Sequence, residues 1–324
     1  MTVEQGQPPK MAGPRKKLVS IITPAYNESE CVDELARQLG AVMDSEPGYD
    51  FEVIVVENGS VDDTWEKLLA IRAADPRFRI VKLARNFRMD GGLTAGLANA
   101  SGDAAVLMTA DLQDPPELIP TFIRKWEEGY ENVYMTVSDR QGTGPLRRFN
   151  STAFYWLAGK LTDGAIPRNA SDFRLVDRRV YETVNVMDER NRFVRGLFAW
   201  VGFKSVGIEH ERPPRFGGES KAYSLKVLDL ASKGILAHSY LPLRLITGTG
   251  LVISAVSLIG LLVAVVQFFV AGVPFAGFGT IVGLILLMFG LLFLFLGVIS
   301  EYIGLIYEEV KHRPNYVISE RVGW

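Results

Sequence analysis

Hydrophobic positions in the first half of the chain fall into short runs, separated by polar turns and by longer amphipathic stretches. The runs are rich in β-branched residues, which is typical of buried strands. They cover residues 18–23, 51–56, 78–83, 104–108 and 133–137. Helical periodicity fills the first gaps, over residues 30–43 and 64–74. This alternation predicts an α/β fold with a mostly parallel sheet covered by helices.

Polar clusters follow the first four predicted strands, each at the carboxyl end of its strand. They cover residues 24–28, 57–63, 85–90 and 109–114. Open parallel sheets bind their ligands beyond the carboxyl ends of the strands. The pattern therefore predicts one ligand site that is built from these four turns.

The last third of the chain contains a long apolar segment. From Leu245 to Ser300 there is no charged residue, although the chain has 35 Lys+Arg and 37 Asp+Glu. The segment divides near residues 272–274, and each part is long enough to cross about 30 Å of hydrocarbon. A buried pair of core helices is the alternative, but the length favours a two-helix transmembrane hairpin.

Basic residues flank this segment on both sides. Arg244 precedes it, and Lys311, His312 and Arg313 follow it, whereas the turn at 272–274 carries no charge. Because positive flanks remain in the cytoplasm, the pattern predicts a multi-pass protein of the cytoplasmic membrane, with its large domain and both termini cytoplasmic.

The remaining boundaries follow from composition. Residues 1–17 are polar and end in basic residues, which predicts a disordered basic tail. Residues 18–221 are expected to form the catalytic domain, and 301–324 a cytoplasmic C-terminal tail. Residues 222–244 are amphipathic, and helices there are expected either to lie in the membrane interface or to pack on the domain.

Glycines recur every seven residues in the second apolar part, at Gly283, Gly290, Gly297 and Gly304. Small residues at helical spacing allow close approach of another membrane helix. We expect this face to pack against the first span or against a neighbouring protomer, which makes the chain a candidate homo-oligomer.

Charge and cysteine content exclude two classes of protein. The net charge is −2, whereas nucleic-acid-binding domains are usually basic. The only cysteine is Cys31, so an internal disulfide is excluded and a reducing compartment is favoured.

The turn at residues 108–117 contains candidate metal ligands. In an extended segment alternate side chains share a face, which would align Thr109, Asp111 and Gln113. Carboxylate and amide oxygens suit Mg²⁺ or Mn²⁺ bridging a diphosphate. The alternative is a structural turn in which Asp114 only begins a helix, and this segment alone does not decide between the two.

Seven motifs in order connect these turns with the rest of the chain. They are TPAYNE at 23–28, VVENGSVDDT at 55–64, ARNF at 84–87, DLQDPPE at 111–117, SDFRL at 171–175, ERNRF at 189–193 and RFGGESK at 215–221. The ordered set resembles the family 2 glycosyltransferases, and within them the polyprenyl-phosphate glycosyltransferases. The resemblance implies a GT-A fold with a membrane hairpin. It also implies inverting, metal-dependent transfer of one sugar from a nucleotide sugar such as UDP-glucose to a polyprenyl phosphate such as undecaprenyl phosphate.

The resemblance also implies roles for individual residues. Those expected to hold the nucleotide sugar are Pro24, Tyr26, Glu28, Glu57, Asn58, Arg85 and Asp111. Asp111 and Gln113 are the implied metal ligands, and Asp172 with Asp111 the implied catalytic residues. Guanidinium groups match phosphate oxygens, and the candidate acceptor-binding residues are Arg140, Arg147, Arg212, Arg215, Ser220 and Lys221.

Three positions depart from the usual pattern of that family. Asn58 stands where a second acid is usual, Thr109 where an Asp-x-Asp motif begins, and Arg88 where glycine follows phenylalanine. We therefore expect weaker metal binding or an altered donor geometry. A catalytically impaired membrane scaffold of the same fold is the alternative function, whereas a processive synthase is set aside because its Gln-x-x-Arg-Trp segment is missing.

The chemistry of the acceptor limits what Asp172 has to do. A phosphate monoester has a second pKa of about 6, so it is mostly ionised at neutral pH. Little proton abstraction is needed, and Asp172 is expected to orient the acceptor or the metal more than to act as a base.

Overall fold

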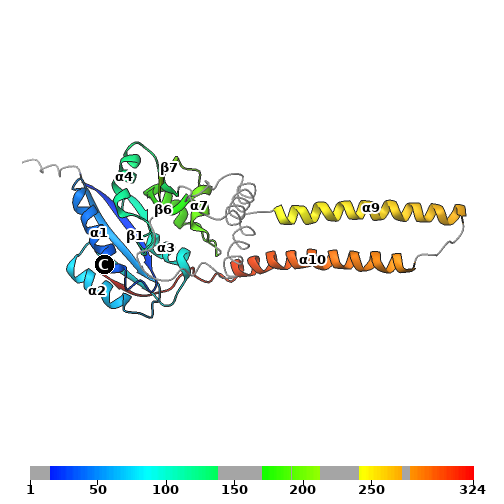
Figure 1. Cartoon of the computed structure of the whole chain (residues 1–324), viewed down its shortest axis with the longest axis horizontal. Coiled ribbons are helices and arrows are strands. Elements are labelled where there is room, and N and C mark those ends of the chain that lie inside the picture. Colours follow the sequence, from blue (N-terminus) through cyan, green and yellow to red (C-terminus); the bar gives the residue numbers. More distant parts are fainter. Residues whose placement is uncertain (1–14, 138–169, 191, 212–240, 272–277) are drawn as a thin grey trace, which may run out of the picture.

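The computed structural model describes residues 15–137, 170–190, 192–211, 241–271 and 278–324, and it shows a sheet domain from which two long helices extend (Figure 1). The strands are β1 (Lys17–Ala25), β2 (Tyr49–Glu57), β3 (Phe78–Leu83), β4 (Ala104–Leu107), β5 (Asn132–Val137), β6 (Ala170–Asp177), β7 (Ser205–His210) and β8 (Ile318–Val322). The helices are α1 (Val32–Ser45), α2 (Thr64–Ala74), α3 (Arg88–Ala98), the short 3-10 helix η1 (Pro116–Leu118), α4 (Ile119–Glu127), α6 (Arg178–Asn185), α7 (Val194–Trp200), α9 (Leu241–Ala271) and α10 (Phe278–Val310).

Within the described residues the strands form one eight-stranded sheet in the order β7-β5-β6-β4-β1-β2-β3-β8. The four central strands are parallel, as predicted. The prediction of a mostly parallel sheet is confirmed, because β5 and β7 also run in the direction of the central strands. Two strands run the other way: β6 pairs antiparallel with β4 and with β5, and β8 pairs antiparallel with β3. The fold is therefore a mixed sheet around a parallel centre.

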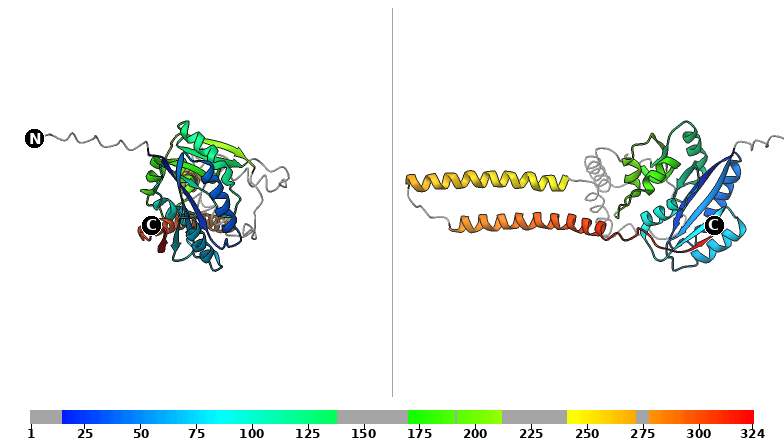
Figure 2. Two further views of the ribbon diagram at one scale, coloured as in Figure 1. Left: turned by 90° about the vertical axis from the view of Figure 1, so that its left-hand side faces the viewer. Right: turned by 180° about the vertical axis from the view of Figure 1, so that it is seen from behind.

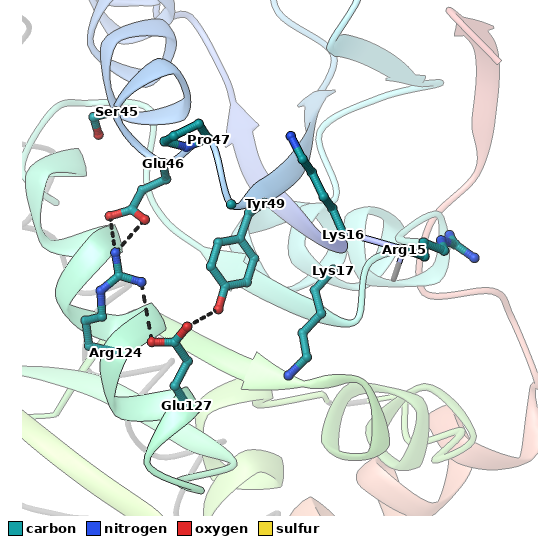
Figure 3. Close-up of a pocket in the computed structure, with 10 residues that line it drawn as sticks. Arg15, Lys16, Lys17, Ser45, Glu46, Pro47, Tyr49, Arg124 and Glu127 are labelled. Atoms are coloured by element: carbon teal, nitrogen blue, oxygen red, sulfur yellow. Dashed lines mark hydrogen bonds and ion pairs between the residues drawn. The ribbon is translucent and has the colours of Figure 1, made fainter. Parts of the chain in front are cut away.

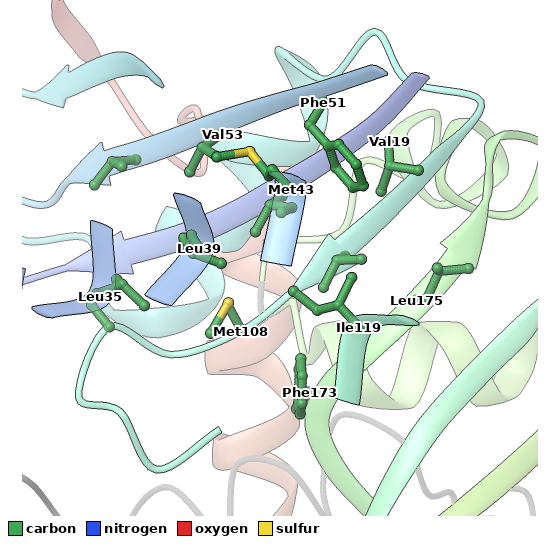
Figure 4. Packing of buried hydrophobic residues seen from close by; sticks show 14 of the residues in the cluster. Val19, Leu35, Leu39, Met43, Phe51, Val53, Met108, Ile119, Phe173 and Leu175 are labelled. Carbon is green, nitrogen blue, oxygen red and sulfur yellow. The ribbon is translucent and has the colours of Figure 1, made fainter. Parts of the chain in front are cut away.

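The core lies in two layers, one on each face of the sheet. Side chains alternate along each strand, so Ile21 faces the layer under α1 and α4, while Ile22 faces the layer under α3 and α6. Figure 4 shows the first layer, in which Leu35 and Leu39 of α1 pack beside Val53 of β2. The two buried layers fix the strands, and with them the turns at the carboxyl edge.

The end of the chain returns to the sheet. We expected only a tail over 301–324, but α10 continues to Val310, and β8 then adds to the edge of β3. The Ala84 N–H donates to the Val317 carbonyl at 2.9 Å, and the Ser319 hydroxyl to the Lys82 carbonyl at 3.1 Å. Residues 318–322 carry no strong strand signal, because only the first and last residues of β8 are apolar and half-buried.

Helices α9 and α10 lie side by side and point away from the sheet, on the side opposite to the start of β1 (Figures 1 and 2). Among the described residues, one helical segment, Leu287–Val310, is long and apolar enough to cross a membrane, and none of it is buried. Long apolar side chains that stay exposed, such as Phe293 at 68%, favour a lipid environment over a protein core.

The glycine face of α10 is not covered by α9. A Cβ atom added at Gly290, Gly297 or Gly304 would meet no heavy atom of the described residues within 4 Å. From the sequence we expected the first span or a neighbouring protomer to contact this face. At these three glycines no described part of the first span is in contact with it. Packing against another protomer stays a prediction.

Candidate active site

The turns after β1 and β2 are joined by hydrogen bonds. The Asn27 N–H donates to the Ser60 hydroxyl at 3.1 Å, and the Val61 N–H donates to the Asn27 side-chain oxygen at 2.9 Å. The Glu28 N–H donates to the Thr64 hydroxyl at 3.0 Å. The left-handed backbone of Asn27, at φ 54°, is one that asparagine tolerates. Two of the predicted polar clusters therefore form one structure.

Glu57, at the end of β2, is a buried carboxylate with one satisfied oxygen. Its Oε1 accepts the Ser60 N–H, while its Oε2 is buried without a hydrogen-bond partner among the described residues. The residue is only 1% exposed. Leaving a buried acceptor unsatisfied costs free energy, and an N–H or O–H group of a ligand would recover it.

Asn58 uses both ends of its amide to hold the turn after β3. Its Nδ2 donates to the Arg88 carbonyl at 2.8 Å, and its Oδ1 accepts the Phe87 N–H at 2.9 Å. Arg88 has a left-handed φ of 64°. A carboxylate cannot donate to a carbonyl, so the amide at Asn58 suits this contact where an acid would not.

The other predicted donor-site residues lie at the same edge. Pro24 is buried at the end of β1, and Tyr26 and Glu28 are half-buried in the turn that follows. Arg85 is exposed after β3, with its guanidinium 4.1 Å from the centre of the Phe87 ring. The structure thus brings these residues together, and their contacts with a donor stay a prediction.

The segment after β4 surrounds one hydroxyl with two carboxylates. Thr109 Oγ1 lies 2.7 Å from Asp111 Oδ1 and 2.8 Å from Asp114 Oδ2. The Thr109 N–H also donates to Asp114 Oδ2 at 2.9 Å. Asp111 is 6% exposed and Asp114 is fully buried. A hydroxyl carries one hydrogen, so it can donate to only one of the two carboxylates at a time.

The segment after β4 is not extended over its whole length, as the expected alternation of side chains required. Strand β4 ends at Leu107, and Leu112 has a left-handed φ of 58°, so the backbone turns instead of continuing extended. The Gln113 N–H folds back to Asp111 Oδ1 at 3.3 Å. Thr109 Oγ1 contacts Asp111, which agrees with the expected shared face, and it also contacts Asp114, which the sequence did not predict.

The donor set of this turn fits a hard divalent cation. Carboxylate oxygens of Asp111 and Asp114 lie within 2.8 Å of one hydroxyl, and such oxygens are the ligands that Mg²⁺ and Mn²⁺ prefer. Within the described part of the chain no cluster of three or more His, Cys, Asp or Glu side chains is arranged to hold a metal. A cation held here by Asp111 and Gln113 would therefore take its remaining ligands from water and substrate.

Asp172, on β6, forms a bidentate ion pair with Arg195 of α7. Arg195 Nε lies 2.8 Å from Asp172 Oδ1, and Nη2 lies 2.6 Å from Oδ2. The register of the sheet places Asp172 near Asp111: Leu107 pairs with Arg174 in antiparallel β4 and β6, so residues just after 107 and just before 174 lie at the same edge.

Two further charged residues lie around this ion pair. Burial lowers the pKa of the Arg174 guanidinium to about 10, with the charge of Asp172 opposing the shift. Asp90, on α3, accepts the Val194 N–H at 3.0 Å, and burial raises the pKa of its carboxyl group. Asp90 ends the predicted polar cluster at 85–90, but no feature of the sequence pointed to Arg195 or to the contact between α3 and α7, because only the fold brings these elements together.

The predicted acceptor-binding residues lie outside the described residues. These are Arg140, Arg147, Arg212, Arg215, Ser220 and Lys221, together with residues 1–14 of the predicted tail and 222–240 of the predicted amphipathic helices.

A cavity of about 610 Å³ lies at the opposite edge of the sheet, where β1 and β2 begin (Figure 3). Its acidic groups are paired with other lining residues: Arg124 Nη2 contacts both oxygens of Glu46 at 2.6 and 2.8 Å, and the Tyr49 hydroxyl donates to Glu127 at 2.6 Å. Because it lies at the amino ends of the strands, this cavity is not the candidate active site.

Comparison with known proteins assigns the family. The family model "Glycosyl transferase family 2" matches residues 20–184. A bactoprenol glucosyl transferase of Shigella phage SfV is 36% identical over 301 residues, covering 93% of this chain and 98% of the relative. An uncharacterized glycosyltransferase of Synechocystis sp. is 39% identical over 305 residues, covering 94% and 96%. A crystal structure of glucosyl-3-phosphoglycerate synthase from Mycobacterium tuberculosis with UDP is 19% identical, covers 68% of this chain and 80% of that chain, and gives a TM-score of 0.47.

The chain therefore belongs to the family 2 glycosyltransferases, and its sheet is of the GT-A type. Its similarity over almost its whole length to the bactoprenol glucosyl transferases assigns it to the polyprenyl-phosphate glycosyltransferases of that family.

Proposed function

We propose that this enzyme transfers one sugar, with inversion, from a nucleotide sugar such as UDP-glucose to a polyprenyl phosphate such as undecaprenyl phosphate. The observation that carries the proposal is the position of two carboxylate groups at the same edge of the sheet. Asp111 follows β4 among the donor turns, and Asp172 begins the neighbouring β6.

The donor would bind across the turns after β1, β2 and β3. The unpaired Oε2 of Glu57 would accept an N–H or O–H from the base or ribose. Pro24, Tyr26 and Glu28 would form one wall of this site, and Asn58 would keep the turn with Arg88 in place. Arg85 supplies an exposed positive charge for the diphosphate.

The diphosphate would lie against the turn after β4. Asp111 and Gln113 would hold a Mg²⁺ or Mn²⁺ ion, which stabilises the negative charge on the departing nucleotide when bound. Thr109 would contribute through its hydrogen bonds to Asp111 and Asp114, which fix the two carboxylates. The side chains thus orient the leaving group before transfer begins.

The acceptor would approach from the side of β6. Its phosphate oxygen is already ionised near neutral pH, so it can attack the anomeric carbon without a strong base. Asp172 is bound at both oxygens by Arg195, an arrangement that suits an orienting carboxylate. Arg140, Arg147, Arg212, Arg215, Ser220 and Lys221 remain the candidates for the acceptor phosphate.

The helices α9 and α10 would form a two-span hairpin, with the catalytic domain and both termini in the cytoplasm. The return of β8 to the sheet supports this, because a chain that leaves the domain and rejoins it must cross a membrane an even number of times. Cys31 is 1% exposed, so a single introduced cysteine can report topology. Val273→Cys should react with an impermeant maleimide from outside the cell, and Ser319→Cys should not. The reverse labelling would contradict this orientation.

The activity is tested with the purified full-length chain, undecaprenyl phosphate and radiolabelled UDP-sugars. Extraction of labelled lipid that depends on Mg²⁺ or Mn²⁺, and that is lost in Asp111→Asn, is the expected result. Labelled nucleotide that binds without any lipid product, across several UDP-sugars and both ions, would favour the catalytically impaired scaffold instead.

A further inference from the structure

A second cavity lies where the chain leaves α10 and meets the sheet domain. Its volume is about 510 Å³, and its polar lining includes Asn185, Asp188, Arg190, Arg192, His312 and Tyr316. None of the candidate active-site residues within the described chain lines it. The cavity contains both arginines of the ERNRF motif at 189–193, to which the sugar-transfer site gives no role.

Three buried polar atoms of its lining residues have no hydrogen-bond partner among the described residues: Asn185 Oδ1, Arg190 Nε and Arg192 Nε. The other nitrogens of the two guanidinium groups are used. Arg192 donates to the carbonyls of Met187 at 3.0 Å and Val184 at 2.8 Å, and Arg190 donates to the Arg313 carbonyl. Each guanidinium is thus held in place by its other nitrogens, while its Nε–H has no acceptor among the described residues. A buried charged donor without a partner is costly, which indicates a ligand that offers acceptors.

The charge of the lining favours an anion. Arg190, Arg192 and His312 face the cavity, and Asp188 is the one carboxylate among the described residues that line it. Asp188 is already paired with Arg190 at 3.0 Å. Burial also lowers the pKa of Arg192, and a bound anion would offset this loss of solvation. The oxygen of Asn185 adds a place for a hydroxyl donor on the same ligand.

The position of the cavity indicates which class of anion binds there. His312 comes two residues after Val310, where the apolar helix ends. At a rise of about 1.5 Å per residue, the cavity lies at headgroup depth if α10 spans the bilayer. We propose that it binds the phosphate group of an anionic phospholipid such as phosphatidylglycerol, at a site separate from sugar transfer. The proposal rests on the membrane placement of α10 given under the proposed function.

Such a lipid would bind three parts of the protein together. The cavity is bounded by α3, by the loop after α6 and by residues 312–316. Residues 312–316 already contact the domain through Asn315, whose Nδ2 donates to the Glu189 carbonyl at 3.0 Å. A phosphate in the cavity would add charge-assisted bonds to this junction and fix the domain relative to α10.

His312 offers a matched pair of variants, because its backbone is left-handed at φ 48° and both Asn and Asp tolerate that conformation. His312→Asp places a negative charge at the cavity, whereas His312→Asn does not. The full chain in detergent is titrated with phosphatidylglycerol, phosphatidylcholine or inorganic phosphate, while melting temperature and retained lipid by native mass spectrometry are followed. Phosphatidylglycerol should raise the melting temperature of the wild type and of His312→Asn. Its affinity for His312→Asp should be about tenfold lower.

Three results would overturn the proposal: an equal shift with phosphatidylcholine, the same saturable shift with inorganic phosphate alone, or equal lipid affinity of the two His312 variants. Sugar transfer to undecaprenyl phosphate by both variants is measured in the same detergent. Normal transfer together with unchanged lipid affinity in His312→Asp would reject the lipid site and leave the proposed function standing. If the wild type itself shows no sugar transfer, the proposed function is rejected, whatever the result for the lipid site.

Discussion

The two halves of the sheet position their functional residues in different ways. In the donor half, from β1 to α4, each functional turn directly follows a parallel strand, and neighbouring turns bond to each other. In the acceptor half, from β5 to β7, Asp172 forms an ion pair with Arg195 of the later helix α7. The first residue of α7, Val194, donates its N–H to Asp90 of the donor half, 104 residues away. Parallel β-α units bring sequence motifs to one edge automatically, whereas antiparallel strands require pairing between distant segments.

The largest expected effect lies in the donor half. Asp111→Asn removes the carboxylate that we propose holds the divalent cation at the diphosphate, and transfer should fall by about 10³-fold or more. Thr109→Ala removes a hydroxyl that contacts both Asp111 and Asp114 but removes no charge, so its loss should be smaller. Initial rates at saturating donor measure both. Equal losses in the two variants would show that the hydrogen bonds of the Thr109 hydroxyl matter as much as the charge of Asp111, which would contradict this prediction.

These two variants also show what the sequence could predict. The five strands and the helices at 30–43 and 64–74 are confirmed in position, since α/β units carry strong local periodicity. The clustering of the four polar turns is confirmed for the same reason. The contact of Thr109 with Asp114 was not predicted, because the left-handed Leu112 bends a segment that its sequence suggests is extended.

The acceptor half was less predictable because its geometry depends on tertiary contacts. Strand β6 inserts between β4 and β5, out of chain order. In the donor half, β8 likewise comes from residues 318–322 and pairs with β3. Neither position follows from local patterns. The role of Asn58 was not predictable either. In the sequence it is only an amide where an acid is usual, and its hydrogen bonds to the backbone of Phe87 and Arg88 are visible only in the structure.

The second-largest expected effect concerns the ion pair of Asp172 and Arg195 in the acceptor half. Arg195→Ala leaves Asp172 without its bidentate partner, and kcat should fall about 100-fold through loss of orientation. Arg195→Lys keeps the charge with a single point of contact, so it should recover part of this loss. The KM for the nucleotide sugar should stay constant in both. A change in donor KM with unchanged kcat would place Arg195 in the donor half instead.

A smaller effect concerns pH. Burial raises the pKa of Asp90 in the folded state, so the native protein holds this proton more tightly than the unfolded chain. Stability from Asp90 is therefore present below the carboxyl pKa of the unfolded state, and it is lost as pH rises through the raised value. Asp90→Asn can still accept the Val194 N–H but has no charge to bury. Melting temperatures from pH 4 to 7 should show the variant gaining on the wild type as pH rises, and a constant difference would contradict this origin.

The smallest effect returns to the donor half, at the strained turn after β3. Arg88 adopts a left-handed backbone at φ 64°, which costs a non-glycine residue about 1–2 kcal/mol. Asn58 maintains this conformation by donating to the Arg88 carbonyl, and that bond needs no side chain at position 88. Arg88→Gly should therefore raise the free energy of unfolding by about 0.5–1 kcal/mol, after the greater flexibility of glycine in the unfolded chain is subtracted. Thermal unfolding of the full chain in detergent measures it, with Arg88→Ala as the control that removes the same guanidinium but keeps the strain. If both variants destabilise the protein equally, the guanidinium itself stabilises the turn, and local backbone geometry would not explain how this part of the donor half is held.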